Sequence, residues 1–140
     1  MPSRALVVDA NILVRAVLGR KVRDVIAANS GSVSFFVPEA AFVEAEEHVA
    51  ALAVKRGGDP ELALAFLRSL SELVELIGGE VYGQFEAEAR ERLGKRDQED
   101  WPILASALAL GCPIWTEDTD FFGCGVATWT TDRVQMFLRE

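Results

Sequence analysis

Short apolar runs that alternate with helix-forming segments constrain this 140-residue chain to an α/β fold. Residues 4–8, 34–37, 113–116 and 126–130 are predicted strands, and residues 80–82 are a weaker fifth candidate. Because the first run lacks polar alternation, we expect it to be buried on both faces. The pattern therefore predicts a mainly parallel sheet with helices on both of its sides.

The segments between these runs carry helix start and stop signals. Pro60 after Asp59 is typical of a helix start, and Gly111 is typical of a helix end. Helices are expected over residues 12–29 with a break at Gly19, over residues 39–56, 59–77, 84–93 and 100–110, and in a short final segment. No repeat or linker interrupts the pattern, so residues 1–140 are expected to form a single domain.

The composition excludes several classes of protein. Half of the residues are hydrophobic, which argues against disorder. Two cysteines, Cys112 and Cys124, are too few for a disulfide framework, and the single histidine, His48, excludes histidine-based zinc sites. No apolar stretch reaches the length of a membrane span, and the apolar run near the N-terminus, residues 5–8, is too short for a signal-peptide core. We therefore expect a soluble, cytoplasmic protein without a membrane partner.

The net charge of −8 argues against a passive nucleic-acid binder, which usually carries excess lysine and arginine. It does not argue against a metal-dependent nuclease, because such an enzyme gathers carboxylates whose bound cations reverse the local charge. The basic residues also form two groups, one between Arg15 and Arg23 and the other between Arg90 and Arg96.

Two of the acidic residues follow predicted strands directly. Asp9 stands at the carboxyl end of the first run, and Asp118 stands just beyond the run at residues 113–116. Ligands of parallel α/β sheets bind beyond the carboxyl ends of the strands. If these two strands are neighbours, the two carboxylates converge at one edge of the sheet.

Some of these acids also have a purely structural explanation. Asp9 or Asn11 can cap the helix that begins near Ile12. Glu44 fits the solvated face of a helix. Either Asp97 or Asp100 can cap the helix that continues through Pro102. From the residues alone, both explanations stay open for each of these acids.

Asp118 and Asp120 can form an Asx turn after their strand. Together with Glu117, however, they place more negative charge there than a turn requires. Crowded carboxylates repel one another unless a cation compensates, and hard divalent cations prefer such oxygen ligands.

The order of these motifs resembles the PIN-domain family of ribonucleases. Val-Val-Asp-Ala-Asn-Ile-Leu at residues 7–13 resembles the opening motif of the family, and Glu44 matches its second acid. Residues 100–108, an aspartate followed by an apolar, alanine-rich run, resemble the helix of the third acid. Residues 116–121 are similar to its closing Thr-x-Asp-x-Asp-Phe turn. The resemblance extends from Asp9 to Asp120.

This resemblance implies a three-layer α/β/α sandwich with a mainly parallel central sheet. It implies hydrolysis of RNA phosphodiester bonds with one or two Mg²⁺ or Mn²⁺ ions, leaving a 5′-phosphate and a 3′-hydroxyl. Many members of this size resemble the VapC toxins of bacterial toxin–antitoxin pairs. A homodimer and a small antitoxin protein are therefore expected as partners, beside the RNA substrate.

The family pattern also implies roles for individual residues. The expected catalytic acids are Asp9, Glu44, Asp100 and Asp118, and the expected metal ligands are Asp9, Asp100 and Asp118, joined by Asp97 and Asp120. Asn11 and Thr116 are expected to hydrogen-bond to the ligands. Arg15 and Arg96 are expected to contact the RNA backbone. The sequence leaves open whether Asp97 and Asp120 bind the metal directly.

Other classes of protein share parts of this pattern. A haloacid-dehalogenase phosphatase needs a second aspartate at the position of Asn11. A phosphoreceiver domain needs a late lysine, and none follows Lys95. A non-catalytic PIN-like interaction module is the main alternative, although the intact set of acids argues against it. A different Mg²⁺-dependent phosphohydrolase is the second alternative.

Overall fold

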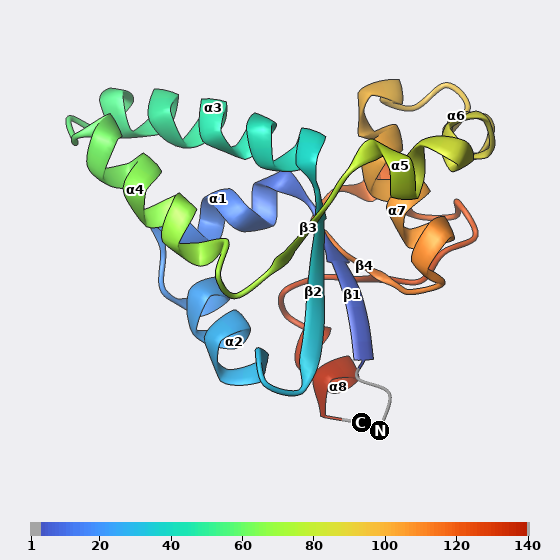
Figure 1. The fold of residues 1–140 in the computed structure, drawn as a ribbon, viewed down its shortest axis with the longest axis horizontal. Coiled ribbons are helices and arrows are strands. Elements are labelled where there is room, and N and C mark those ends of the chain that lie inside the picture. Colours follow the sequence, from blue (N-terminus) through green and yellow to red (C-terminus); the bar gives the residue numbers. More distant parts are fainter. Residues whose placement is uncertain (1–3, 140) are drawn as a thin grey trace.

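A five-stranded sheet lies at the centre of the molecule, and all of its neighbouring strands are parallel (Figure 1). The computed structural model describes residues 4–139. The strands are β1 (Arg4–Val8), β2 (Val33–Pro38), β3 (Glu75–Ile77), β4 (Ile114–Trp115) and β5 (Thr128–Trp129). Their order is β3-β2-β1-β4-β5, so β1 is central, and its residues 6–8 are fully buried. The predicted parallel α/β architecture is confirmed.

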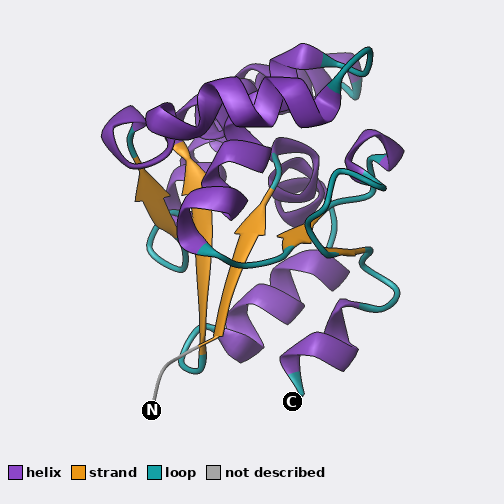
Figure 2. Cartoon of the chain, turned by 90° about the vertical axis from the view of Figure 1, so that its right-hand side faces the viewer, coloured by secondary structure: helices purple, strands orange, loops and turns teal. Residues whose placement is uncertain are grey.

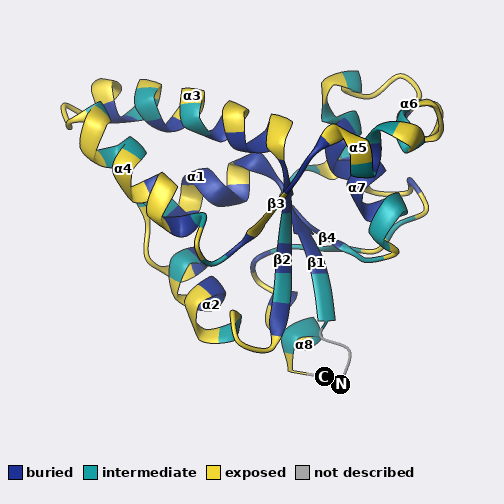
Figure 3. Cartoon of the chain, in the orientation of Figure 1, coloured by how far each residue is buried: buried dark blue, intermediate teal, exposed yellow. Residues whose placement is uncertain are grey.

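Helices cover both faces of this sheet, which gives the expected three layers. The helices are α1 (Ala10–Leu18), α2 (Lys21–Asn29), α3 (Glu39–Lys55), α4 (Pro60–Leu70), α5 (Gly79–Tyr82), α6 (Glu86–Leu93), α7 (Trp101–Leu110) and α8 (Val134–Leu138). Helices α1 to α4 lie on one side of the sheet and α5 to α7 on the other (Figure 1). Figure 3 shows that the buried residues gather along the sheet and on the helix faces that turn towards it.

The helix predicted over residues 59–77 is wrong in its second half. Helix α4 ends at Leu70, where the hydroxyl of Ser71 donates to the carbonyl oxygen of Arg68 at 2.6 Å. The chain then turns and enters β3, which pairs with β2 at the edge of the sheet. Strand pairing with a distant segment therefore overrides the local helical spacing.

The strand predicted at residues 80–82 is also wrong. These residues belong to the short helix α5, in which Tyr82 is buried against Trp101 with ring centroids 5.6 Å apart. The fifth strand of the sheet is β3 instead.

Two glycines act at helix ends as predicted. Gly19 separates α1 from α2. Gly111 ends α7 in the left-handed conformation, with φ at 64°, which glycine adopts without steric cost. Among the helices of the described residues, none is both long enough and apolar enough to cross a membrane.

Candidate metal centre

The carboxyl edge of the sheet brings together two of the acids expected at the site, Asp9 and Asp118. Strands β1 and β4 are parallel neighbours, with Val8 opposite Trp115. Asp9 directly follows β1, and Asp118 lies three residues beyond Trp115. In Figure 2 the longer strand arrows point to one edge of the sheet, and the segment after each strand leaves from that edge. The topology therefore produces the convergence of the two chain segments on which the expected site depends.

Asp9 is buried and makes two hydrogen bonds. Its Oδ1 accepts the backbone N–H of Ile12 at 3.0 Å, so Asp9 is the N-cap of α1. Its Oδ2 accepts the hydroxyl of Thr116. Burial raises the pKa of Asp9 to about 6 against the opposing effect of these hydrogen bonds, and the charges of Asp118 and Glu44 raise it further. The capping explanation is thus correct for Asp9. The same residue also lies near the carboxylates of Asp118 and Glu44.

Thr116 links two of the acids through one hydroxyl group. The side chain is fully buried, donates to Asp9 Oδ2, and accepts the backbone N–H of Asp118 at 2.9 Å. The hydroxyl therefore fixes the end of β1 relative to the turn after β4. Such hydrogen bonds orient a carboxylate in the way that outer-shell partners orient metal ligands.

Among the described residues, three carboxylates lie close enough together to share one ion. Asp100, Asp118 and Asp120 each offer one oxygen atom, and these atoms lie within 4.8 Å of one another. Oxygens on opposite sides of one Mg²⁺ ion are separated by about twice 2.1 Å, so the observed spacing is close to that of a shared ion. Asp100 stands at the start of α7, whereas Asp118 and Asp120 belong to the turn after β4. Asp9 is not a member of this triplet.

Asp100 carries a buried oxygen atom that has no hydrogen-bond partner within the described residues. Its Oδ2 is buried, and no group of residues 4–139 donates to it. Its side chain does not cap α7 either, so the structural explanation fails for this residue. Burial raises the pKa of Asp100 to about 7, and the charges of Asp97, Asp118 and Glu44 contribute further. An unpaired, buried carboxylate oxygen beside two others is a donor set that fits a hard divalent cation.

Glu44 and Asp97 lie at the margin of this cluster. Glu44 is exposed on α3 and lines a small pocket together with Asp100. Asp97 is exposed and accepts the N–H of Glu99 at 3.0 Å, so it caps the short 3-10 helix Gln98–Asp100. Asn11 is exposed on α1 and lines a groove that also reaches Asp118.

Two arginines hold the turn that carries Asp118 and Asp120. Arg96 donates to the carbonyl oxygen of Asp120 at 2.9 Å, and Arg92 donates to that of Cys124 at 3.0 Å. The predicted RNA-binding residue Arg96 thus has a partner within the chain. Arg15, the other predicted RNA-binding residue, is exposed and lines the groove beside Asp118.

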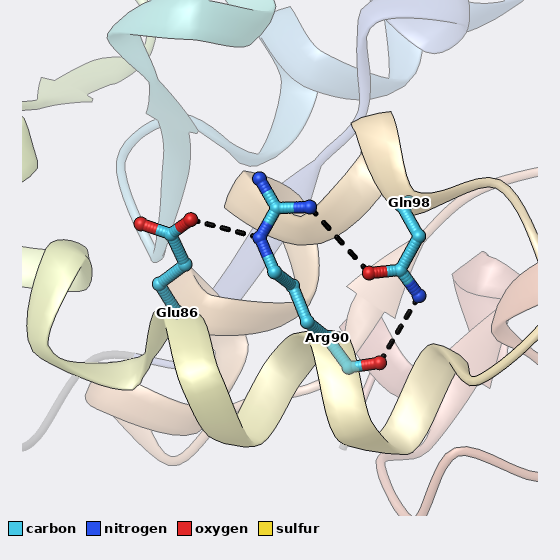
Figure 4. A network of polar contacts seen from close by, with 3 residues as sticks. All are labelled: Glu86, Arg90 and Gln98. Carbon is cyan, nitrogen blue, oxygen red and sulfur yellow. Dashed lines mark hydrogen bonds and ion pairs between the residues drawn. The ribbon is translucent and has the colours of Figure 1, made fainter.

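The segment before Asp100 is anchored by Gln98, which the sequence did not single out (Figure 4). Gln98 Nε2 donates to the carbonyl oxygens of Gly94 at 2.7 Å and Arg90 at 3.1 Å. Arg90 donates to Glu86 at 2.8 Å and lies over the ring of Trp101. No motif or periodicity marks such a glutamine, because its partners are backbone atoms whose positions only the fold defines.

Comparisons with known proteins agree with this fold. The PIN-domain family profile matches residues 7–139. A search of curated proteins finds no match. Among solved structures, PAE2754 from Pyrobaculum aerophilum is 15% identical with a TM-score of 0.73, and the alignment covers 97% of this chain and 90% of that one.

Structures of toxin–antitoxin proteins are similar as well. VapBC2 from Rickettsia felis, solved with a DNA fragment from its promoter, is 14% identical with a TM-score of 0.67. The alignment covers 90% of this chain and 98% of that one. A chain of a toxin–antitoxin complex from Klebsiella pneumoniae is 19% identical with a TM-score of 0.60. The alignment covers 90% of this chain and 97% of that one. At such low identities these structures show a common fold. Since the family profile spans residues 7–139, the chain belongs to the PIN-domain family.

Proposed function

We propose that this chain is an endoribonuclease that depends on Mg²⁺ or Mn²⁺. The observation that carries the proposal is the buried, unpaired Oδ2 of Asp100 beside the carboxylates of Asp118 and Asp120. A fold does not require such an arrangement for its own stability, because uncompensated buried charge is unfavourable. Membership of the PIN-domain family supports a nuclease as the class of protein.

The residues of the cluster would have different roles in the reaction. Asp100, Asp118 and Asp120 would hold the ion, with Asp9 and Asp97 at its margin. Such an ion, when bound, would acidify a water molecule and offset negative charge on the phosphodiester. Glu44, the exposed acid next to Asp100, would accept the proton that the attacking water loses. Thr116 would keep Asp9 and Asp118 in register through its two hydrogen bonds.

We further propose a cellular setting for this activity. The similar structures from Rickettsia felis and Klebsiella pneumoniae are toxin–antitoxin complexes, which supports a role as the toxin of such a pair. The chain would then act on RNA in the cytoplasm, and a small antitoxin would cover the acid cluster. The acidic net charge of −8 leaves one copy with little basic surface, which favours a homodimer that combines cations from both copies.

The variant Asp118→Asn tests the proposed function. Asparagine can still accept the N–H of Asp120, which Asp118 Oδ1 accepts at 2.9 Å, so the turn should persist. Cleavage of a labelled RNA in Mn²⁺ should fall by orders of magnitude. The increase in melting temperature that Mn²⁺ produces in the wild type should shrink, because the ion binds the native state less tightly. Asp9→Asn should behave similarly, since asparagine caps a helix about as well as aspartate.

Glu47→Gln is the matched control, because Glu47 is an exposed acid on the same helix as Glu44. Its cleavage rate and its response to Mn²⁺ should equal those of the wild type. Equal cleavage rates for Asp118→Asn and wild type would contradict the proposal. Binding of Mn²⁺ without cleavage of any RNA would instead favour the non-catalytic PIN-like module.

A further inference from the structure

Two arginines contact the turn at residues 118–124, which carries two acids of the cluster. Arg96 Nη1 donates to the carbonyl oxygen of Asp120 at 2.9 Å, and these two residues are 24 positions apart. Arg92 Nη1 donates to the carbonyl oxygen of Cys124 at 3.0 Å, and these residues are 32 positions apart. The turn is therefore held at two points by one distant stretch of the chain.

The guanidinium groups supply hydrogen bonds that the backbone does not. Within residues 4–139, no backbone N–H donates to the carbonyl oxygen of Asp120 or to that of Cys124. Hydrogen bonds from charged donors are stronger than those between neutral groups. The path of this turn therefore depends on two side chains that lie outside it.

The backbone beside Cys124 leaves room for Arg92. Gly125 has a positive φ of 89°, a conformation that glycine adopts without steric cost, and a Cβ atom there would collide with Nη1 of Arg92. Nη2 of Arg92 also pairs with Glu88 at 2.9 Å, one helical turn earlier on α6. Glycine at position 125 thus serves both the backbone conformation and the approach of the arginine.

Arg96 also belongs to the segment that supplies the third acid of the cluster. Asp100 follows it four residues later, at the start of α7. The acids therefore come from two separate chain segments, and their oxygen atoms lie within 4.8 Å of one another. Carboxylates at this spacing repel when no cation is bound, so their charges push the two segments apart. The hydrogen bond from Arg96 to Asp120 opposes this separation, because it joins the same two segments.

A purely electrostatic role for Arg96 would have the opposite consequence. A positive charge beside carboxylates disfavours the binding of a further cation, because like charges repel. Lys95 is exposed and carries the same charge, but within residues 4–139 its amino group has no hydrogen-bond or ion-pair partner. The two neighbours therefore separate the effect of a hydrogen bond from the effect of a charge.

We propose that Arg96, supported by Arg92, is a positioning residue of the metal site. Its guanidinium group keeps the turn of Asp118 and Asp120 at the distance from Asp100 that one divalent cation requires. The inference rests on the proposed function, because it takes the cluster to be a cation site. It assigns to Arg96 a contact with the protein's own backbone in place of the expected contact with RNA.

Mn²⁺ binding in the absence of RNA tests this assignment. Free Mn²⁺ is measured by electron paramagnetic resonance while the full chain is titrated. Arg96→Met removes the hydrogen bond and should raise the dissociation constant for Mn²⁺ by about tenfold, because ordering the turn would then oppose binding. Arg96→Lys keeps a charged donor and should restore most of the affinity. Lys95→Met removes a neighbouring charge alone, so Mn²⁺ should bind to it as tightly as to the wild type or slightly more tightly.

A second measurement needs no metal. Amide hydrogen exchange in EDTA should be faster at residues 118–124 of Arg96→Met than in the wild type, and unchanged in Lys95→Met. RNA affinity in EDTA should change no more in Arg96→Met than in Lys95→Met, since each variant removes one charge. Cleavage by Arg96→Met should recover as the Mn²⁺ concentration is raised, with the KM for RNA at the wild-type value.

Mn²⁺ binding by Arg96→Met at or above the wild-type affinity would overturn the inference. An equal loss of affinity in Lys95→Met would overturn it as well, because the charge and not the hydrogen bond would then be responsible. If circular dichroism showed that Arg96→Met does not fold, Arg92→Met would decide the question. Weaker Mn²⁺ binding is expected for that variant, and unchanged binding would contradict the positioning role.

The two proposals fail in different ways. A wild type that binds Mn²⁺ and cuts no RNA would contradict the ribonuclease function and leave the positioning role standing. A wild type that cuts RNA, together with an Arg96→Met variant of equal Mn²⁺ affinity and equal hydrogen exchange, would contradict the positioning role alone.

Discussion

At the scale of single residues, the buried carboxylate of Asp9 and the half-buried carboxylate of Asp100 differ in their surroundings. Both oxygens of Asp9 accept hydrogen bonds, whereas Oδ2 of Asp100 has no donor within residues 4–139. Burial raises the pKa of Asp9 to about 6 and that of Asp100 to about 7. Without a cation, the negative form of Asp100 therefore lacks the hydrogen bonds that stabilise the negative form of Asp9.

This difference predicts a pH-dependent effect of Asp100→Asn in metal-free protein. The folded-state pKa of Asp100 lies above the value of 3.8 expected in an unfolded chain. Its contribution to stability is therefore complete below about pH 4 and is lost as the pH rises through about 7. Asparagine mimics the protonated form, so the variant should gain melting temperature over the wild type as the pH rises across this window.

Melting curves in EDTA at several pH values measure this gain. Glu99→Gln, an exposed neighbour, should show no such trend and serves as the control. A difference between Asp100→Asn and wild type that is constant from about pH 4 to pH 8 would show that Asp100 titrates normally.

The positions of the acids could be predicted from the sequence, but their hydrogen bonds could not. Asp9 and Asp118 each follow an apolar strand, and parallel strands end at a common edge. Whether an aspartate caps a helix depends on how its side chain is oriented. Asp9 caps α1 and Asp100 caps nothing, yet both stand at a helix start. The pairing of Thr116 with Asp9 depends on strands that are far apart in the sequence.

At the scale of elements, the two incorrect predictions have one cause. Leu70, Leu73, Val74 and Ile77 follow helical spacing, although the chain leaves the helix after Leu70. Residues 80–82 include valine and tyrosine, which favour strands, and yet they form a helical turn. In such short segments, packing against distant elements outweighs local preference. Longer segments such as α3 and α7 bury many residues along their length, and their spacing predicted them correctly.

The anchored segment between α6 and α7 gives a prediction at this scale. Gln98→Ala removes the hydrogen bonds from Gln98 to the carbonyl oxygens of Arg90 and Gly94. Each such bond contributes about 1 kcal/mol, so the free energy of unfolding should fall by about 1–3 kcal/mol in urea titrations. Because the segment also carries Asp97 and Asp100, half-maximal stabilisation should require more Mn²⁺.

Gln84→Ala is the control for this change, since Gln84 is an exposed glutamine in the neighbouring 3-10 helix Gly83–Phe85. Its unfolding and Mn²⁺ response should match those of the wild type. If Gln98→Ala lowered stability and left the Mn²⁺ response intact, the segment would support the fold and not the cluster.

At the scale of the whole molecule, the sheet order decides where the acids meet. Strand β1 is central and pairs with β2 on one side and β4 on the other. The first acid therefore lies between chain segments that are early and late in the sequence. Its position could be predicted only in outline, because the order of parallel strands is a property of the fold and not of any one segment.

Assembly is the property to measure at this scale. We expect light scattering to give a particle of twice the chain mass of 15.3 kDa, since one acidic copy offers few cations to RNA. Asp118→Asn should give the same mass, because the substitution concerns the cluster and not the contact between copies. A monomer at high protein concentration would contradict the proposed homodimer and leave the metal site untouched.

The hydrogen bond between Asp9 and Thr116 joins residues that are 107 positions apart. A ribosome adds about 5–20 residues per second, so Asp9 exists for roughly 5–20 s before its partner is made. The segment of Asp118 and Asp120 is made later still. During synthesis the growing chain therefore carries separate, unassembled acids for most of that time. The cluster can assemble only after translation has passed Asp120. Any activity that the cluster supports therefore begins after most of the chain has been made.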